Sequence, residues 1–243
     1  MLKQLYEKSE EWFAVLFIVL YVVGNSILDQ VSARLGAEFL VTLPYDLLLL
    51  TVLFLFIAKE KRLAYYGIGR TKAAPGRVLY YVPLIIIATV NIWFGFRLNK
   101  SVGETILYIA GMCAVGVIEE LIFRGLLYQA MCRKRESTAI VVTSVLFGVG
   151  HIVNLFNGSG MQLVENICQL FYAVAIGFLL VSVLYTGKSL IPCMITHAVF
   201  NSLSVFANHD VHDTIQIQIS VVLCLISGIS AAIIFRNGCR GKE

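Results

Sequence analysis

Charged residues are scarce in this chain of 243 residues. They make up 14% of the sequence, whereas hydrophobic residues make up 58% and the mean hydropathy is +0.83. Because soluble domains have about 25% charged residues, this composition excludes an ordinary soluble protein and indicates a polytopic membrane protein. Little sequence remains between the apolar runs, so a separate soluble domain of ordinary size does not fit.

Two kinds of motif are also missing. The six cysteines include no CxxC pair, and a thiol within an apolar run behaves as a small hydrophobic group. We therefore expect neither disulfides nor a cysteine metal site. The first apolar run is not followed by a small-residue cleavage site, so we expect a retained helix rather than a removed signal peptide.

The apolar runs predict the fold. About 20 apolar residues in a helix cross the hydrocarbon core of a bilayer, and eight runs are near this length. We expect an all-α polytopic membrane protein with about eight transmembrane helices, folded as a single integral-membrane domain over residues 1–243. The expected spans are 12–28, 39–58, 78–96, 104–130, 137–156, 161–185, 188–207 and 214–235.

The basic residues predict how these spans are oriented. With eight spans both termini lie on one side, and that side carries fifteen of the nineteen Lys and Arg residues. The opposite loops carry Arg34, Arg97 and Lys100, and Arg124 lies within a span. Since cytoplasmic loops are enriched in Lys and Arg, we expect both termini on the cytoplasmic side of a cell membrane. The net charge of +4 then serves topology and contact with anionic lipid, and it does not require nucleic acid.

Three clusters place polar side chains inside the apolar runs. A charged group at that depth costs at least a few kcal/mol unless it is paired or hydrated, which suggests a function. At about 1.5 Å per residue from the predicted helix ends, all three clusters fall near the middle of the membrane. The clusters are Glu119-Glu120-Leu-Ile-Phe-Arg124, Phe147-Gly-Val-Gly-His151 and His197-Ala-Val-Phe-Asn201.

Helical spacing divides the first cluster. Glu120 and Arg124 are four residues apart, so they share a helix face in the order that favours an ion pair. A paired charge is what burial demands, and we expect this pair to be structural. Glu119 diverges from Glu120 by about 100° and should project free toward a different neighbour, where it suits the role of a general base.

The same four-residue spacing relates the members of the other two clusters. Phe147 lies one turn from His151 and can hold the imidazole in one orientation. His197 and Asn201 share a face, and both can donate hydrogen bonds to a developing oxyanion, where such a donor is worth roughly 2.7–4 kcal/mol. Taken singly, a histidine inside a membrane can also be no more than a hydrogen-bonded bridge between helices.

The other polar residues in or beside the apolar runs suit structural roles. Asp46 and Glu165 are isolated within or near apolar runs, where they suit helix packing or the lining of a cavity. The basic loop 59–77 is expected to be solvated, and its Tyr65 and Tyr66 suit aromatic anchors at the level of the lipid headgroups.

Two further motifs fall on the predicted extracytoplasmic side. The segment His209-Asp210-Val-His212-Asp213 has the composition of a metal-ligand cluster, but a short solvated turn explains it without a metal, because a metal site needs a closed and supported ligand set. The triplet Asn157-Gly158-Ser159 matches a glycosylation acceptor, although such triplets are common.

Taken together, the three clusters resemble the motifs of a known family. The chain is similar to the CAAX-prenyl endopeptidases and bacteriocin-processing proteins, a family of intramembrane proteases that includes the lysostaphin-resistance-type proteins. The similarity consists of the motifs EExxxR, FxxxH and HxxxN in this order, and it covers about 105–205. One such motif alone would be weak evidence, but three in the correct order and in apolar spans are specific.

The resemblance implies a multi-helix membrane fold around a conical cavity, and peptide-bond hydrolysis that in eukaryotic members occurs near the C-terminus of the substrate. Carried onto this chain, it implies that Glu119 and His151 position and deprotonate a water molecule. It also implies that His197 and Asn201 stabilise the tetrahedral oxyanion. The residues that would support these groups are Glu120, Arg124 and Phe147.

The residues permit two versions of this chemistry. Glu119, His151 and His197 could be the ligands of a catalytic zinc ion with an open fourth position. The sequence lacks the HExxH motif that supplies a separate general base, and Glu120 is already expected to pair with Arg124. We therefore favour a site without metal or other cofactor in which Glu119 is the base, and the zinc site is the alternative.

These observations predict an intramembrane endopeptidase. Its substrate would be a membrane-associated peptide or protein, lipidated or leader-bearing, and membrane lipid would be its other partner. The first alternative is a non-catalytic scaffold or immunity protein that binds a peptide in the same cavity. A transporter or proton relay is the other usual owner of intramembrane Glu and His residues, but we find no internal repeat that would support it.

Overall fold

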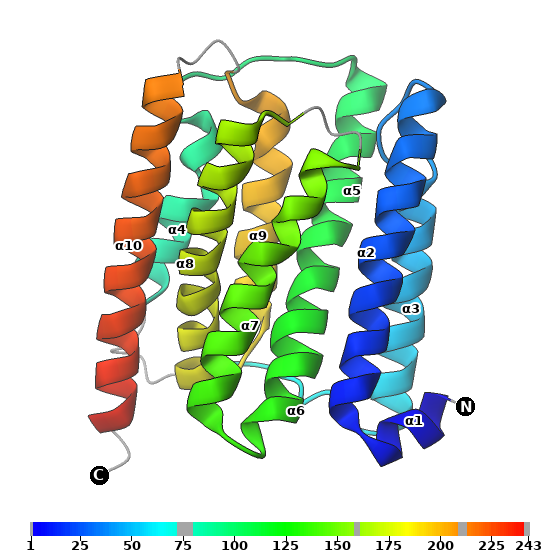
Figure 1. Cartoon of the computed structure of the whole chain (residues 1–243), viewed down its shortest axis with the longest axis vertical. Helices are drawn as coiled ribbons and strands as arrows, with labels where there is room; N and C mark the ends of the chain where they lie inside the picture. The colour runs from blue at the N-terminus through cyan, green and yellow to red at the C-terminus, as the bar shows by residue number, and fades with distance from the viewer. Residues whose placement is uncertain (1, 72–79, 158–160, 209–212, 241–243) are drawn as a thin grey trace.

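The computed structural model describes residues 2–71, 80–157, 161–208 and 213–240. Over these ranges the chain is all-helical, with no β-strand beyond one isolated bridge between Phe96 and Ala207. The α-helices, labelled in Figure 1, are α1 (Leu2–Lys8), α2 (Glu10–Arg34), α3 (Thr42–Lys59), α4 (Val82–Ala88), α5 (Val102–Glu120), α6 (Tyr128–Cys132), α7 (Glu136–Gly150), α8 (Leu163–Gly187), α9 (Ile191–Leu203) and α10 (Asp213–Arg240).

Shorter helical pieces extend several of these helices. A π-helix at Leu121–Leu127 joins α5 to α6, so that Val102–Cys132 forms one long helical segment. Three 3₁₀ turns follow α4, α7 and α9, at Val90–Ile92, His151–Leu155 and Ser204–Phe206. The HDVHD motif at 209–213 lies almost entirely outside the described residues, as do Gly158 and Ser159 of the glycosylation triplet.

Six helical segments in the described part of the chain are long and apolar enough to cross a membrane. They begin at Glu10, Thr42, Val102, Glu136, Leu163 and Thr214. The predicted number of about eight spans is therefore not confirmed. The two remaining apolar runs form shorter helices: the run 78–96 contains α4, which has 7 residues, and the run 188–207 contains α9, which reaches Phe206 with its 3₁₀ turn.

Local sequence explains where the helices begin. Ser9 caps α2, since its side chain accepts a hydrogen bond from the Trp12 amide at 3.2 Å. Ser101 and Glu104 form a capping box at the start of α5, in which each side chain satisfies a backbone N–H of the first turn. Pro192 stands in the first turn of α9, where its missing N–H costs nothing.

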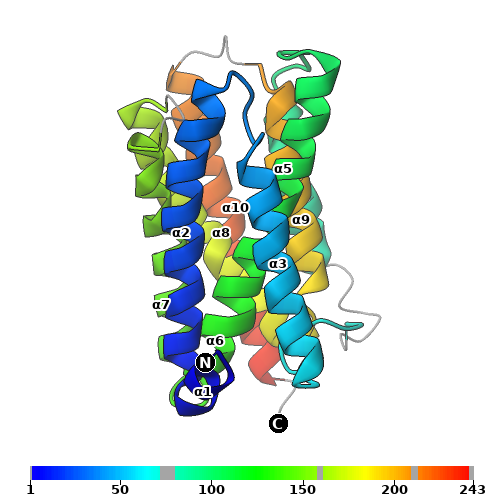
Figure 2. The same cartoon turned by 90° about the vertical axis from the view of Figure 1, so that its right-hand side faces the viewer.

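The long helices run side by side along one axis and alternate in direction. Figure 1 and Figure 2 show α1 and the C-terminal end of α10 at the same end of the bundle, together with the turn between α6 and α7 and the turn between α8 and α9. The basic residues of these segments therefore gather at one end. The turns after α2 and before α5, which carry Arg34, Arg97 and Lys100, lie at the other end.

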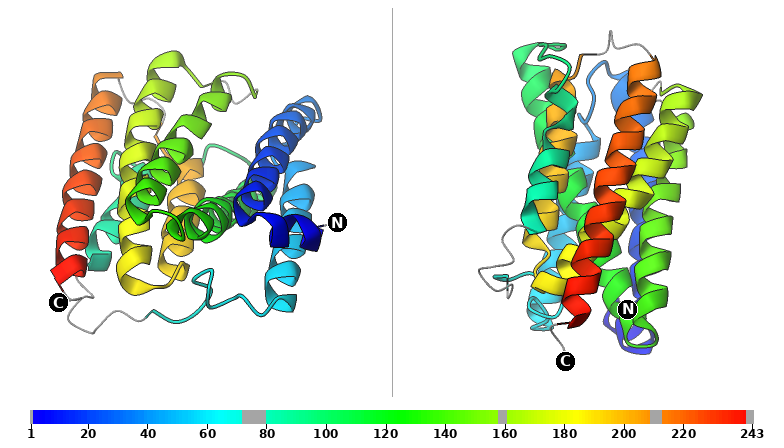
Figure 3. Two further views of the ribbon diagram at one scale, coloured as in Figure 1. Left: turned by 60° about the horizontal axis from the view of Figure 1, so that its bottom comes forward. Right: turned by 90° about the vertical axis from the view of Figure 1, so that its left-hand side faces the viewer.

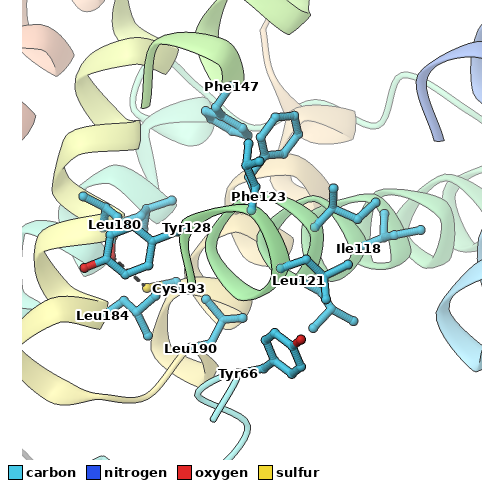
Figure 4. Close-up of a cluster of buried hydrophobic side chains, with 14 of the residues drawn as sticks. Tyr66, Ile118, Leu121, Phe123, Tyr128, Phe147, Leu180, Leu184, Leu190 and Cys193 are labelled. Carbon is cyan, nitrogen blue, oxygen red and sulfur yellow. Dashed lines mark hydrogen bonds between the residues drawn. The ribbon is translucent and has the colours of Figure 1, made fainter. Parts of the chain in front are cut away.

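The segment α5–α6 lies at the centre of the bundle. In the oblique left view of Figure 3, it lies between the pair α2 and α3 on one side and the group α7, α8, α9 and α10 on the other. Its buried residues form much of the apolar core, which Figure 4 shows around Ile118, Leu121 and Phe123, with Phe147 of α7 and Cys193 of α9 packed beside them. Residues of the central segment therefore face neighbours on several sides.

The loop after α3 differs from the expected headgroup segment. Tyr66 is fully buried, and its hydroxyl donates a hydrogen bond to the hydroxyl of Tyr6 at 3.1 Å. Burial raises the pKa of Tyr66 far above its ordinary value. The backbone of Gly67 accepts a hydrogen bond from the Leu190 amide at 2.8 Å. The interpretation of Tyr66 as a lipid anchor is therefore wrong, because this loop is tied to the turn between α8 and α9.

A glycine allows α5 and α9 to approach closely. A Cβ atom at Gly116 would lie 2.6 Å from the backbone nitrogen of Ala198, which real Cβ atoms do not tolerate. Ala198 directly follows His197. The absence of a side chain at Gly116 therefore sets the distance between the end of α5 and the histidine of α9.

We predict that Gly116→Ala destabilises the protein, because the added methyl group must push α9 away. Overpacking of this kind costs about 1–3 kcal/mol. The matched control is Gly103→Ala on the same helix, where a Cβ would meet nothing within 4 Å and where alanine should stabilise the helix slightly. Thermal unfolding in detergent measures both, and equal melting temperatures for the two variants would contradict the packing argument.

Candidate active site

The first and third sequence clusters meet between α5 and α9. The Nε2 atom of His197 lies 3.5 Å from Oε2 of Glu119, and its Nδ1 atom lies 3.0 Å from Oε1 of Glu120. His197 thus stands between two adjacent carboxylates from the end of α5. The side chains are largely buried, with exposed fractions of 14% for Glu119 and 8% for His197.

The Glu120 carboxylate forms a buried ionic group. Arg124 Nη1 donates to Glu120 Oε1 at 3.0 Å, and both side chains are fully buried. His197 Nδ1 donates to the same oxygen, so one carboxylate oxygen joins the π-helix after α5 to α9. Arg124 lies in that π-helix, all seven residues of which are buried; such segments are frequent at functional sites.

Phe147 connects the second cluster with the other two. The guanidinium carbon of Arg124 lies 3.9 Å from the centre of the Phe147 ring, at a distance suited to a cation–π interaction. The same ring packs edge to face against His151 and His197, with centroid distances of 5.1 and 5.5 Å. It also contacts Phe123, as Figure 4 shows. Phe147 is thus the apolar surface that both histidines share.

His151 lies where α7 changes into a 3₁₀ helix. Its Nδ1 atom is 2.9 Å from the carbonyl oxygen of Phe147. A carbonyl oxygen can only accept, so Nδ1 carries the hydrogen, and the neutral ring has its lone pair on Nε2. The backbone carbonyl of His151 accepts a hydrogen bond from Asn166 of α8 at 2.8 Å. His151 is therefore held from both sides.

Tyr21 of α2 is a site residue that the sequence motifs do not include. Its hydroxyl donates a hydrogen bond to Oε1 of Glu119 at 2.6 Å. The expectation that Glu119 projects free is therefore wrong, because the carboxylate is held between Tyr21 and His197. The signal in the sequence was weak: Tyr21, Asn25 and Asp29 interrupt an apolar run at four-residue intervals.

Asn201 is less closely integrated than the other motif residues. It lies one turn after His197 on α9 and is half-buried. Its backbone carbonyl accepts a hydrogen bond from Ser204, but the structure contains no hydrogen bond from its side chain to Glu119, His151 or His197. The helix places it on their side of α9 through its spacing from His197.

The donor atoms do not form a three-ligand metal site in this arrangement. Glu119 and His197 are close together, but among the described residues no three His, Cys, Asp or Glu side chains are placed so that they could hold a metal ion. Two cavities lie elsewhere: one of about 340 Å³ near Tyr128 and Lys188, and an apolar one of about 590 Å³ between α8 and α10.

Comparison with known proteins identifies the central part of the chain. Residues 101–203 match the family model described as type II CAAX prenyl endopeptidase Rce1-like. The chain carries an Rce1-like domain. No curated protein and no solved structure gave a match.

The Rce1-like domain runs from the start of α5 to the end of α9. It contains all three motifs, so the family resemblance read from them is confirmed. Tyr21 lies outside the domain on α2. The hydrogen bond between Tyr21 and Glu119 thus joins the Rce1-like domain to the helix pair that precedes it.

We predict that Arg124→Leu is strongly destabilising, because it leaves the charge of Glu120 buried without its cation. Removal of one partner of a buried pair costs about 3–5 kcal/mol. The control is Lys134→Leu, which breaks an exposed pair with Glu11 of 2.8 Å and should cost at most about 1 kcal/mol. Chemical unfolding in detergent measures the difference.

A double variant keeps this prediction testable if Arg124→Leu does not fold. Glu120→Gln removes the uncompensated charge, so Glu120→Gln with Arg124→Leu should recover much of the lost stability. A double variant as unstable as the single one would show that the packing of Arg124 on Phe147, rather than its charge, is what matters.

Proposed function

We propose that this protein is an intramembrane endopeptidase of the CAAX type that hydrolyses a peptide bond by means of water activated at Glu119. The observation that carries the proposal is the position of the Glu119 carboxylate. One of its oxygens is held by Tyr21, and the other faces His197 at 3.5 Å. The Rce1-like domain supports a CAAX-type protease in general, and the roles of single residues are the proposed part.

In the first step a water molecule attacks the carbonyl carbon of the substrate. Glu119 accepts the proton of this water through the oxygen that Tyr21 does not hold. The lone pair on Nε2 of His151 accepts a hydrogen bond from the second hydrogen of the same water, because Nδ1 is already bound to the Phe147 carbonyl. Two acceptors then orient the oxygen lone pair toward the peptide.

In the second step the tetrahedral intermediate breaks down. Its oxyanion accepts hydrogen bonds from Asn201 and from Nε2 of His197, and this requires that the His197 ring carries both of its protons. The carbon–nitrogen bond then breaks, and Glu119 passes its proton to the leaving amine, so the carboxylate is restored.

The surroundings of the site restrict the substrate. Glu119 and His151 lie within long apolar helical segments, and His197 lies in the shorter apolar helix α9, so a substrate must reach them from the membrane or from a cavity open to it. We propose a membrane-associated peptide or protein, lipidated or leader-bearing, with lipid as the other partner. The basic end of the bundle, which carries both termini, would face the cytoplasm and its anionic lipids.

We predict that Glu119→Gln abolishes cleavage while the fold is retained, because glutamine has the size of glutamate but cannot accept the proton. The matched control is Glu104→Gln on the same helix, since glutamine also serves in a capping box. Membrane peptides from cells that carry the intact protein or either variant can be compared by mass spectrometry. Peptide products that depend on Glu119, and not on Glu104, are expected.

The same comparison of the intact protein with its variants distinguishes the proposed protease from the alternative functions. Retained cleavage in Glu119→Gln would overturn the proposed role of the carboxylate. A partner that co-purifies equally with both variants, without any product, would favour a scaffold or immunity protein. Cleavage by the purified protein should survive a chelator, because the proposed mechanism uses no metal; loss of activity that zinc restores would favour the zinc site.

We predict that Tyr21→Phe lowers kcat roughly tenfold. A hydrogen bond to a charged group is worth about 1.5–3 kcal/mol, and a rise of about 1.4 kcal/mol in the activation free energy slows the reaction tenfold. Tyr21 positions Glu119 and does not bind substrate, so KM should stay the same. The control is Tyr45→Phe, which removes a hydroxyl bound at 2.7 Å to the Leu20 carbonyl on the same pair of helices. Equal rates for both variants would argue against a positioning role for Tyr21.

A further inference from the structure

A line of polar side chains runs along the interface between α2 and α3 and ends at Glu119. On α2, Tyr21, Asn25 and Asp29 follow one another at intervals of four residues, so they share one face of the helix. At about 1.5 Å per residue they cover about 12 Å of the helix axis. Thr42 and Asp46 stand at the same interval on α3. Such a line is unusual in apolar helices.

Both ends of this line have hydrogen-bond partners within the protein. At the end near the α2–α3 turn, Thr42 donates to Asp29 at 2.8 Å, and the hydroxyls of Thr42 and Ser32 lie 3.2 Å apart. At the other end Tyr21 donates to Glu119 at 2.6 Å. These contacts satisfy the polar atoms at the two ends.

The middle of the line is different. Both carboxyl oxygens of Asp46 and the side-chain oxygen of Asn25 are buried without a hydrogen-bond partner. Asp46 is fully buried, and Asn25 is 8% exposed. The Asn25 side chain is directed at the Asp46 carboxyl across the interface but makes no hydrogen bond of good geometry with it. Among the described residues no Lys or Arg forms an ion pair with Asp46. These three oxygen atoms are thus buried between α2 and α3 without a partner.

Such atoms cannot remain unsatisfied cheaply. Each buried polar group without a partner costs several kcal/mol where no solvent can reach it. Buried water usually satisfies groups of this kind, provided that the gap is polar and offers two to four partners. The two carboxyl oxygens of Asp46 and the side-chain oxygen of Asn25 are enough partners for such a water.

We propose that water occupies the α2–α3 interface between Asp29 and Tyr21 and forms a hydrated path from the turn after α2 to Glu119. The hydration follows from the unsatisfied oxygens alone. The further role of this path, the supply of water for hydrolysis, rests on the proposed function. The path also explains why polar residues line up on two helices that lie outside the Rce1-like domain.

Hydroxyl-radical labelling of the intact protein tests the path, because radicals formed from bound water modify the side chains beside it. Tyr21 and Tyr66 are both buried, with exposed fractions of 7% and 1%, but only Tyr21 borders the proposed path. Mass spectrometry should find Tyr21 modified several times faster than Tyr66. Equal slow modification of both tyrosines would overturn the proposal.

Two variants of Asp46 separate water from packing. Asp46→Leu has a similar size but no polar atom, so it should dry the interface and reduce the labelling of Tyr21 to the level of Tyr66. Asp46→Asn keeps the polar atoms and should keep the labelling. Labelling that is insensitive to Asp46→Leu would overturn the path. Labelling that disappears when sodium replaces a large organic cation would assign the buried oxygens to a metal cation instead of water.

Thiol accessibility provides a second readout that does not use the tyrosines. In a chain whose native cysteines are replaced, Asp29→Cys should react with a membrane-impermeant methanethiosulfonate faster than Ile27→Cys. Both positions lie at similar height on α2, but Ile27 is 57% exposed on the outer face of the helix bundle, where lipid would cover it. Equal rates would contradict the path.

The outcomes for the path and for the proposed function are distinguishable. Labelling of Tyr21 in a protein that shows no cleavage would leave the path standing and overturn the proposed function. Cleavage that depends on Glu119, in a protein whose Tyr21 is not labelled, would leave the proposed function standing and overturn the path. If both hold, Asp46→Leu should lower kcat more than Asp46→Asn does.

Discussion

The charge of Glu120 must be compensated inside a bundle of apolar helices, and the arrangement of the site depends on how this is done. Arg124 and His197 Nδ1 share one oxygen of its carboxylate, each at 3.0 Å. Arg124 keeps the pair neutral, while His197 is tied to α5 and turns its Nε2 atom toward Glu119. Glu120, which takes no part in the proposed chemistry, thus fixes the orientation of His197, which does take part.

This ion pair is effective only because α5, α7 and α9 approach closely around it. Gly116 lets the backbone of α9 lie against α5. Phe147 fills the space beside Arg124 and contacts both histidines. The ring is large, stiff and apolar, so it limits the rotation of both imidazoles. The four-residue spacing of the FxxxH motif is therefore a packing requirement as well as a family signature.

The sequence predicted those features that depend on neighbours along one helix. The helical class, the pair of Glu120 with Arg124 and the contact of Phe147 with His151 all follow from spacing. Features that depend on distant segments were not predictable in this way. Tyr21 lies 98 positions from Glu119, and no local pattern ties the two together. Hydropathy also cannot tell that the runs at 78–96 and 188–207 form short helices, because apolar character persists beyond the ends of α4 and α9.

The position of Tyr21 changes how the first helices are understood. The motifs alone place the site within about 105–205, and α2 and α3 would then serve only as packing. In the structure α2 supplies the hydrogen bond that orients Glu119, and the polar face that carries this tyrosine continues through Asn25 toward Asp29. A purely packing face would gain from apolar residues at these positions, since each polar group buried there must find a partner. The presence of polar groups on both α2 and α3, aligned with the carboxylate, is therefore best explained if this helix pair belongs to the site.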